Sequence, residues 1–378
     1  MCPVFPSIEI VVILFLFGVV AVWCIPKHQT ADLKTGEADD LRKKLELENE
    51  FRKTVATVVG GLFGTALLGY FVQVRRAELE LQTRYETRVN QAITFLAGAT
   101  AGERIRGVAE LRSLAEDRPE NYQEIAEILS GHLRQQHSPW PARGDGSPAP
   151  ETRAALFALG RVVALAQAER GELTPEELRS LLNLKKINAS ELNLTQLMLP
   201  CADLRGANFS NSRLDSADLS DSDLTRALLA GDRTWLYETN LAGATLTNAT
   251  LDGARLESAT LTDCYLKEAS LVEADLTGAT LEAAVFKDAV LRSAVMDRSI
   301  LKGASLEGAD LSGAKLDLAR DLEMDQLVPA KVDENTTQLP PSIDFEALRA
   351  GQARYHFRGV LEVLAERWSA HLRASGWH

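Results

Sequence analysis

A large apolar residue recurs at every fifth position through most of the C-terminal half of the chain. Each pentad has Leu, Phe or Met at its centre, Ala, Ser, Thr or Cys two positions earlier, and mostly polar residues elsewhere. Nine pentads cover residues 187–231, two extra residues follow, and seventeen pentads cover residues 234–318. This period fits neither a strand, whose faces alternate every second residue, nor an amphipathic helix with about 3.6 residues per turn. The chain must therefore turn within each pentad and stack its two inward positions in columns.

The large central residues of this array are the predicted core. They are Leu204, Phe209, Leu214, Leu219, Leu224, Leu241, Leu246, Leu251, Leu256, Leu261, Leu266, Leu271, Leu276, Leu281, Phe286, Leu291, Leu301, Leu306 and Leu311. Cys264 falls on the small inward position and is expected to be a buried free thiol.

The pentads Ala202-Asp203-Leu204, Ala217-Asp218-Leu219, Ala274-Asp275-Leu276 and Ala309-Asp310-Leu311 resemble the consensus of the pentapeptide-repeat family. That resemblance implies a right-handed quadrilateral β-helix with four pentads per coil. At a spacing of about 4.8 Å per layer, the array would form a rod roughly 30 Å long. Both ends of such a stack are open strand edges that need a cover. The helices before Ile187 and the segment 332–340, which resembles the terminal segment of such arrays, are the expected covers.

Two apolar runs near the N-terminus, residues 10–25 and 55–74, predict membrane-spanning helices, because neither contains a charged residue. They define a transmembrane hairpin over residues 1–74 with a polar loop at 26–54. The seven basic residues of that loop place it in the cytoplasm by the positive-inside rule. The adjacent Arg75 and Arg76, and the inward thiol in the array, favour instead a cytoplasmic C-terminal part at the inner membrane.

Small residues in the second run, Ala56, Gly60 and Gly64, recur at the spacing that lets two membrane helices pack closely. They predict helix pairing, with the first run or with another copy. The competing interpretation is that glycine is simply common in membrane helices.

Helical periodicity returns over residues 75–186. It is interrupted by a loop at 137–150 that is rich in Pro, Gly and Ser. Thr174, Pro175 and Glu177 form the capping box that starts a helix. Part of this region resembles the helical module of membrane-bound bacterial family members. It is interpreted either as a spacer or as a protein-docking surface.

The last part of the chain, residues 319–378, is expected to hold the capping segment and a final helix. An apolar stripe formed by Phe357, Leu361, Leu364, Trp368 and Leu372 predicts that this helix packs on the protein. The expected fold class is thus α+β, with two transmembrane helices, a helical middle domain, the β-helix of residues 187–318 and a C-terminal helix.

Charge and candidate chemistry narrow the function. The net charge of −12 disfavours direct binding to nucleic acid through its phosphates, and the four cysteines form no metal-ligand spacing. No motif for catalysis or for a phosphate or dinucleotide cofactor is found, so we expect no catalytic, cofactor-binding or metal site, no small-molecule substrate and no enzyme activity. The two extra residues, Asp232 and Arg233, adjoin Trp235 and Tyr237. These aromatic residues form a possible partner contact, although Trp235 packing on the rod is the alternative.

Three functions fit these features. The first is a membrane-tethered scaffold that presents an acidic rod to protein partners. The second follows from the resemblance, because soluble family members that resemble B-form DNA act on gyrase, and the array carries 20 acidic and 11 basic residues. The third is a membrane effector that self-associates through its spanning helices.

Overall fold

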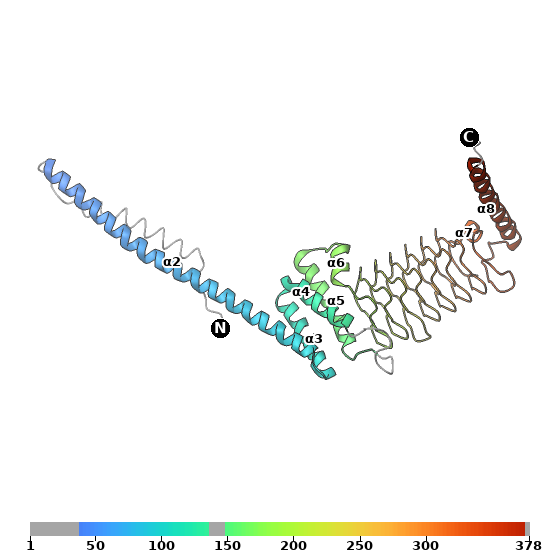
Figure 1. Ribbon diagram of the computed structural model, residues 1–378, viewed down its shortest axis with the longest axis horizontal. Helices are drawn as coiled ribbons and strands as arrows, with labels where there is room; N and C mark the ends of the chain where they lie inside the picture. The colour runs from blue at the N-terminus through green and yellow to red at the C-terminus, as the bar shows by residue number, and fades with distance from the viewer. Residues whose placement is uncertain (1–37, 136–147, 375–378) are drawn as a thin grey trace. The chain divides into compact units, whose positions relative to one another are not determined.

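The computed structural model describes residues 38–135 and 148–374. The chain divides into two compact units, Met1–Thr87 and Arg88–His378. The described part of the first unit is a stretch of one long helix, α2 (Ala38–Leu96), whose last turns belong to the second unit. Figure 1 shows α2 as a continuous helix. Residues 38–54, which were expected to belong to a loop, are therefore helical.

The predicted membrane localisation is wrong. Within residues 38–135 and 148–374, no helix contains a stretch that is long and apolar enough to cross a bilayer. The second apolar run is an internal part of α2, which also includes the charged residues on both sides of it and is diluted by Gly60, Gly61, Gly64 and Gly69. The first predicted span, residues 10–25, lies outside the described residues.

The second unit begins with a helical domain. Its elements are α3 (Ala101–Asp117), the 3₁₀ turn η1 (Pro119–Asn121), α4 (Tyr122–Gln135), α5 (Thr152–Arg170) and α6 (Pro175–Leu181). The predicted capping box at the start of α6 is present, since Thr174 and Glu177 cap each other's backbone N–H groups. Most of the predicted loop 137–150 lies outside the described residues.

A buried ion pair joins the helices of this domain. Arg104 Nε of α3 lies 2.5 Å from Glu151 Oε1 at the start of α5, and the carboxylate of Glu151 is almost fully buried. Arg104 also donates hydrogen bonds to the carbonyls of Gly98 and Ala99, just after α2. One guanidinium thereby fixes three segments, which positions α5 against the structure that follows.

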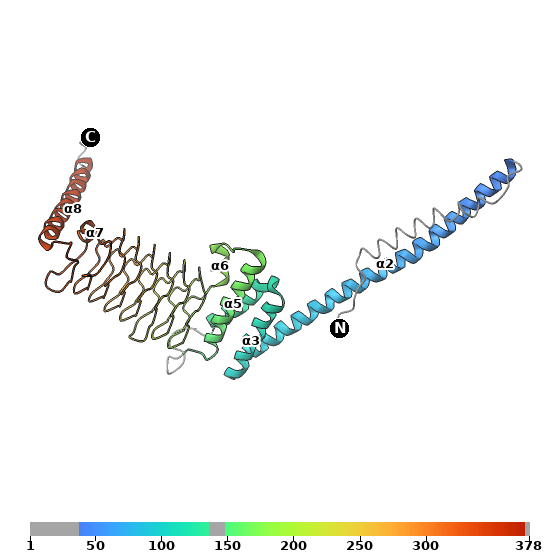
Figure 2. The ribbon, with the colours of Figure 1, turned by 180° about the vertical axis from the view of Figure 1, so that it is seen from behind.

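That structure is a β-helix (Figures 1 and 2). Parallel bridges join residues 20 apart in its first coils, such as Asn183 to Asp203 and Asp203 to Asp223. Twenty residues are four pentads, so each coil has four sides, as the resemblance implied. The bridges begin at Asn183, one pentad before the expected start, and continue to Arg320 with later pairings at Lys331 and Gln338.

Each pentad closes with a turn at its corner. At Leu204, for example, the carbonyl accepts a hydrogen bond of 2.9 Å from the N–H of Ala207, and Gly206 has a φ of 65°. A positive φ at the third position of a four-residue turn is typical of a type II turn. The same position is held by non-glycine residues in many pentads, including Lys186 (φ 57°) and Arg226 (φ 60°).

The core is made of the two inward columns. All the predicted core residues are buried, with at most 1% of their surface exposed, and the alanines two positions earlier fill the space between them. The Cys264 thiol is buried as expected, and burial raises its pKa to about 12. A thiol that resists ionisation in this way is a packing residue.

The helical domain covers the first coil. Arg134 of α4 donates to the carbonyl of Asn183 at 2.8 Å, and Arg153 of α5 donates to that of Asn193 at 2.6 Å. Gly160 lies against the carbonyl of Met198, where a Cβ atom would approach the oxygen to 2.7 Å. The helices before the array thus occupy its first edge, as expected.

The other end is closed by the chain that follows, which includes α7 (Met324–Leu327) and α8 (Phe345–Ala374). Gln326 donates to the carbonyls of Leu301 and Ala304. Gln352 of α8 repeats this arrangement one segment later, at the carbonyls of Leu327 and Ala330.

The prediction that the stripe of the final helix packs on the protein is wrong for its described side chains. Phe357, Leu361 and Leu364 are 66%, 50% and 51% exposed. Only the start of α8 is anchored, through Leu348 and Gln352, and Figures 1 and 2 show the rest of the helix leading away from the rod. The side chains of Trp368 and Leu372 are outside the described set.

Candidate interaction surface of the rod

The outward residues of the rod form columns because equivalent positions of successive coils are bridged. Two of the four sides carry the charged and aromatic clusters, and each is defined by its bridged residues. Face A comprises Asn183, Asp203, Asp223, Thr245, Tyr265, Val285 and Ser305, and face C comprises Asn193, Arg213, Trp235, Arg255, Asp275, Val295 and Lys315. Neighbouring coils fix the spacing within each column at about 4.8 Å.

The two-residue insertion is absorbed at a corner of the rod. The bridges that cross it join residues 22 apart, as in Arg213 to Trp235, and the 20-residue spacing returns with Trp235 to Arg255. The hydroxyl of Thr234 accepts a hydrogen bond from the N–H of Asn211 and donates one to the carbonyl of Ala230. Asp232 and Arg233 are left exposed at the turn while the column of face C continues undisturbed.

Trp235 is held between two arginines of its own column. The guanidinium carbons of Arg213 and Arg255 lie 4.6 and 5.1 Å from the centre of the indole ring. Each guanidinium is in turn bound by a carboxylate two residues later, Asp215 at 3.0 Å and Glu257 at 2.7 Å. The structure therefore favours the interpretation in which Trp235 packs on the rod, with both ring faces covered.

Tyr237 is the aromatic side chain of this region that is open to solvent, with 46% of its surface exposed. A hydrogen bond with Glu238 raises the pKa of its hydroxyl. Glu191, Asn211, Arg213, Asp232 and Trp235 line a shallow depression beside the insertion. The predicted partner contact at Trp235 and Tyr237 thus has an exposed phenol next to a fixed indole, and binding there stays a prediction.

Face A carries a ladder of charges at its first coils. Asp203 is contacted by Arg205 at 2.7 Å and Lys185 at 3.1 Å, and Arg205 also approaches Asp223 at 3.5 Å. Burial alone would raise the pKa of Asp203, but the hydrogen bonds from Arg205 and Lys185 outweigh it and hold the pKa below its usual range. Asp203 therefore stays ionised and fixes both cations.

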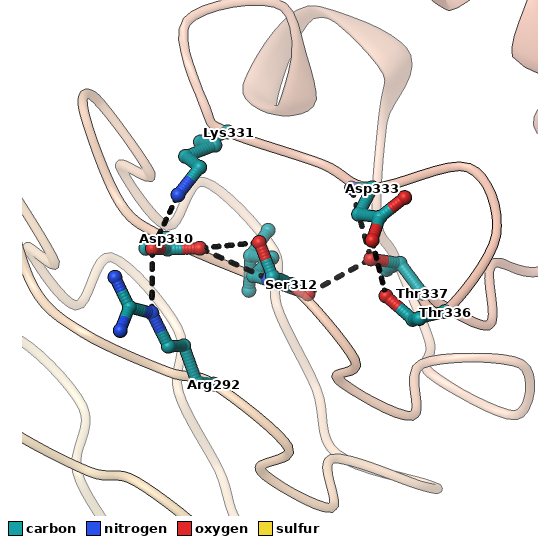
Figure 3. A network of polar contacts seen from close by, with 8 residues as sticks. Arg292, Asp310, Ser312, Lys331, Asp333, Thr336 and Thr337 are labelled. Atoms are coloured by element: carbon teal, nitrogen blue, oxygen red, sulfur yellow. Dashed lines mark hydrogen bonds and ion pairs between the residues drawn. The ribbon is translucent and has the colours of Figure 1, made fainter.

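A second carboxylate of this kind lies near the other end. Asp310 accepts hydrogen bonds from Arg292 Nε and Lys331 Nζ, both at 2.8 Å, and from the hydroxyl of Ser312 at 2.6 Å (Figure 3). Burial would raise the pKa of Asp310, yet these donors hold it well below the usual range. Because Lys331 belongs to the final segment, Asp310 ties that segment to the repeat.

The other two kinds of site considered are a metal site and a helix-pairing surface. Among the described side chains, no group of three or more His, Cys, Asp or Glu residues is placed to hold a metal ion. Gly60 and Gly64 of α2 have open space around them, and the side chain of Ala56 is outside the described set. Helix pairing through these residues therefore stays a prediction.

Sequence reasoning missed the cations that gather at the corner after face A. Arg134, Lys185, Lys186, Arg205 and Arg226 are separated along the chain, and no local motif marks them. A search for basic residues at intervals of 20 would have found Lys185 with Arg205, but Arg134 reaches the corner only through the folded helical domain.

Comparison with known proteins supports the repeat. A family model for pentapeptide repeats matches eight copies, at residues 183–229, 239–278 and 284–320. No curated protein sequence matches.

Among solved structures, the chain is similar to HetL, a pentapeptide repeat protein involved in heterocyst differentiation regulation in the cyanobacterium Nostoc. The two are 32% identical, with 42% of this chain and 85% of HetL covered and a TM-score of 0.17. QnrB1, a plasmid-mediated fluoroquinolone resistance protein, is 15% identical over 45% of this chain and 92% of its own, with a TM-score of 0.24.

A pentapeptide repeat protein from the Arabidopsis thaliana thylakoid lumen is 26% identical over 32% of this chain and 76% of its own, with a TM-score of 0.14. These TM-scores are low, so the assignment rests on the family model and on the four-sided coil of 20 residues. The chain belongs to the pentapeptide-repeat family.

Proposed function

We propose that the protein is a non-enzymatic interaction module that presents a rigid, acidic β-helix to protein partners. The observation that carries this proposal is the ladder of bridges, which continues from coil to coil and fixes every outward column. A surface fixed in this way loses little conformational entropy when a partner binds. The repeat therefore suits recognition more than it suits chemistry, which needs convergent side chains in a pocket.

Trp235 and Tyr237 are the aromatic part of the proposed surface. Since the faces of Trp235 are covered by Arg213 and Arg255, a partner would reach the edge of the indole and the exposed phenol of Tyr237. Tyrosine is frequent among the residues that dominate binding energy at interfaces.

Crosslinking of the full chain in cells, followed by identification of the captured proteins, tests the proposal. Recovery of one specific protein partner is expected, and capture of only abundant background proteins would contradict it. Tyr237→Ser should then reduce recovery. The matched control is Tyr265→Ser, which alters a tyrosine on face A that is 55% exposed, against 46% for Tyr237. Equal recovery with both variants would reject the aromatic contact while leaving the module proposal standing.

A role as a DNA mimic is the competing proposal. Mimicry needs uncompensated negative charges at regular spacing, and the rod has more acidic than basic residues. However, several carboxylates are neutralised by adjacent cations, including Asp203, Asp215, Glu257, Glu307 and Asp310. We therefore rank mimicry second. Inhibition of gyrase supercoiling by the purified chain would reverse this ranking.

A further inference from the structure

A corner of the rod concentrates positive charge on a protein that is acidic as a whole. This cationic corner comprises Arg134 of α4 and Lys185, Lys186, Arg205 and Arg226 of the first three coils. Arg134 reaches it through its hydrogen bond to the carbonyl of Asn183, the first residue of face A. All five side chains are at least partly exposed.

The carboxylates at this corner do not balance the cations. Asp203 binds Lys185 and Arg205, and Asp223 lies near Arg205. Lys186 and Arg226 form no ion pair with any of the side chains that the structure describes. Arg134 donates to a carbonyl, which carries no net charge, so its own charge is not cancelled. Five cations thus face two carboxylates.

The absence of a side chain at Gly206 leaves space between the two unpaired cations, and the Lys186 side chain lies over part of it. Lys186, Gly206 and Arg226 hold the same turn position in three successive coils, and Lys186 Cγ lies 3.5 Å from where a Cβ atom of Gly206 would be. With about 4.8 Å between coils, the backbones at Lys186 and Arg226 are about 10 Å apart. Gly206 contributes no side chain to the gap, and Arg205 lies beside it at an intermediate height.

Farther along the rod, the lysines at the same corner are paired with acidic residues. Lys267 pairs with Glu268 at 3.3 Å, and Lys287 pairs with Glu307 at 2.9 Å. The excess of positive charge is therefore restricted to the coils next to the helical domain.

We propose that the cationic corner binds an acidic segment of a partner protein in an extended conformation. The inference rests on the proposed function and names the chemistry of the partner. In an extended polyproline II segment, which has three residues per turn, carboxylates three residues apart lie on the same face about 9 Å apart, close to the separation of the Lys186 and Arg226 backbones. Arg205, already oriented by Asp203, can offer its remaining N–H groups between them.

Nucleic acid fits this corner less well. Its phosphates recur every few ångströms along the whole duplex, so a bound nucleic acid would extend along the acidic remainder of the rod. A short acidic peptide can end where the positive charge ends. The net charge of −12 then repels polyanions at long range while permitting a local contact.

The test measures binding of a fluorescent, glutamate-rich peptide to the full chain by anisotropy, with a single-stranded oligonucleotide as a further probe. The variant is Lys186→Glu with Arg226→Glu. Both positions have positive φ, and glutamate occupies the equivalent turn position at Glu191 and Glu238, so the variant should fold. The matched control is Arg298→Glu with Lys302→Glu, which makes the same charge change elsewhere on the rod.

The peptide should bind the wild type, and the variant should weaken binding by about tenfold or more, with less dependence on salt. The control should change affinity by less than about twofold. Failure of the peptide to bind, equal weakening by the control, or tighter binding of the oligonucleotide would overturn the proposal. Because the peptide assay needs no cellular partner, a negative result here is distinguishable from a failure of the crosslinking experiment.

Discussion

The two ends of the β-helix are closed by different means. A folded helical domain covers the first coil, where Arg134 and Arg153 donate to backbone carbonyls. At the other end, chain segments without a domain of their own are tied on by side chains, chiefly Asp310, Gln326 and Gln352. Both arrangements give hydrogen-bond partners to backbone groups at an open strand edge, which could otherwise pair with another chain.

The two kinds of cap leave different net charges on the surface of the rod. A guanidinium that caps a carbonyl keeps its full charge, so the covered first coil is left with positive charge on its surface. Arg292 and Lys331 instead meet the carboxylate of Asp310, and their charges are largely cancelled. Similar side chains thus create a potential binding surface at one end and a structural clamp at the other.

The largest expected effect concerns the contact that closes the first coil. Gly160→Val should lower the free energy of unfolding by roughly 3 kcal/mol, because a Cβ atom would lie 2.7 Å from the Met198 carbonyl and backbone cannot move aside cheaply. Urea unfolding gives the magnitude, and hydrogen exchange at the amides of Ala189 and Asn208, which pair with the carbonyls of Asn208 and Ile187, reports whether the first coil opens.

Gly359→Ala is the control for that variant. Gly359 lies in α8, where an added Cβ atom would meet nothing within 4 Å beyond the helix's own backbone, so alanine should stabilise the helix by up to about 1 kcal/mol. Unchanged stability of Gly160→Val would mean that the helical domain does not hold the first coil closed, and the comparison between the ends would fail.

The second prediction addresses the clamp. Asp310→Asn should cost about 2 kcal/mol locally, because Arg292 and Lys331 lose the carboxylate that both of them bind. Hydrogen exchange should rise at Lys331 and Gln338, whose amides pair with Ala309 and Ala314, and should stay unchanged in the first coil. Asp288→Asn, which replaces an exposed aspartate of the same region, should leave exchange at both ends as it was.

A pH titration sharpens the same contrast. The folded pKa of Asp310 lies below its unfolded value of about 3.9, so its contribution is present above that value and is lost as the pH falls through the folded pKa. The last coil should therefore lose protection on acidification below about pH 4 by roughly 1–2 kcal/mol. This loss should disappear in Asp310→Asn, and its persistence there would assign it to other carboxylates.

The sequence was sufficient for the repeat because every coil repeats the same local requirement. Each pentad repeats a large residue, a small residue two positions earlier and a turn that accepts many residue types, with one interruption. The burial of the large and small residues follows from this spacing alone. The capping box at Thr174 and Glu177 was equally local. The box at Thr100 and Glu103 has the same spacing and starts α3, but it was not among the features predicted from the sequence.

Features that depend on long-range packing could not be read in this way. The apolar stripe of α8 was assumed to be covered, but periodicity shows which face is apolar and not what lies against it. The uncharged run of residues 55–74 likewise did not show that its helix continues through charged residues on both sides. The five residues of the cationic corner meet only because coils stack at intervals of 20 and α4 packs on the first of them.

The smallest effect concerns a pair of acidic residues near the same end of the rod, Asp297 and Asp317. Burial, and then the adjacent Asp317, raise the pKa of Asp297, so this pair contributes most at low pH and loses stability as the pH rises through the folded pKa. Asp297→Asn should therefore stabilise the end of the rod at neutral pH by roughly 0.5 kcal/mol, since the site is partly open to solvent. The gain should vanish in acid, where Asp310 is losing its own contribution. Equilibrium unfolding at the two pH values measures it, and a destabilised variant at neutral pH would show that the two carboxyls share a hydrogen bond that outweighs their repulsion.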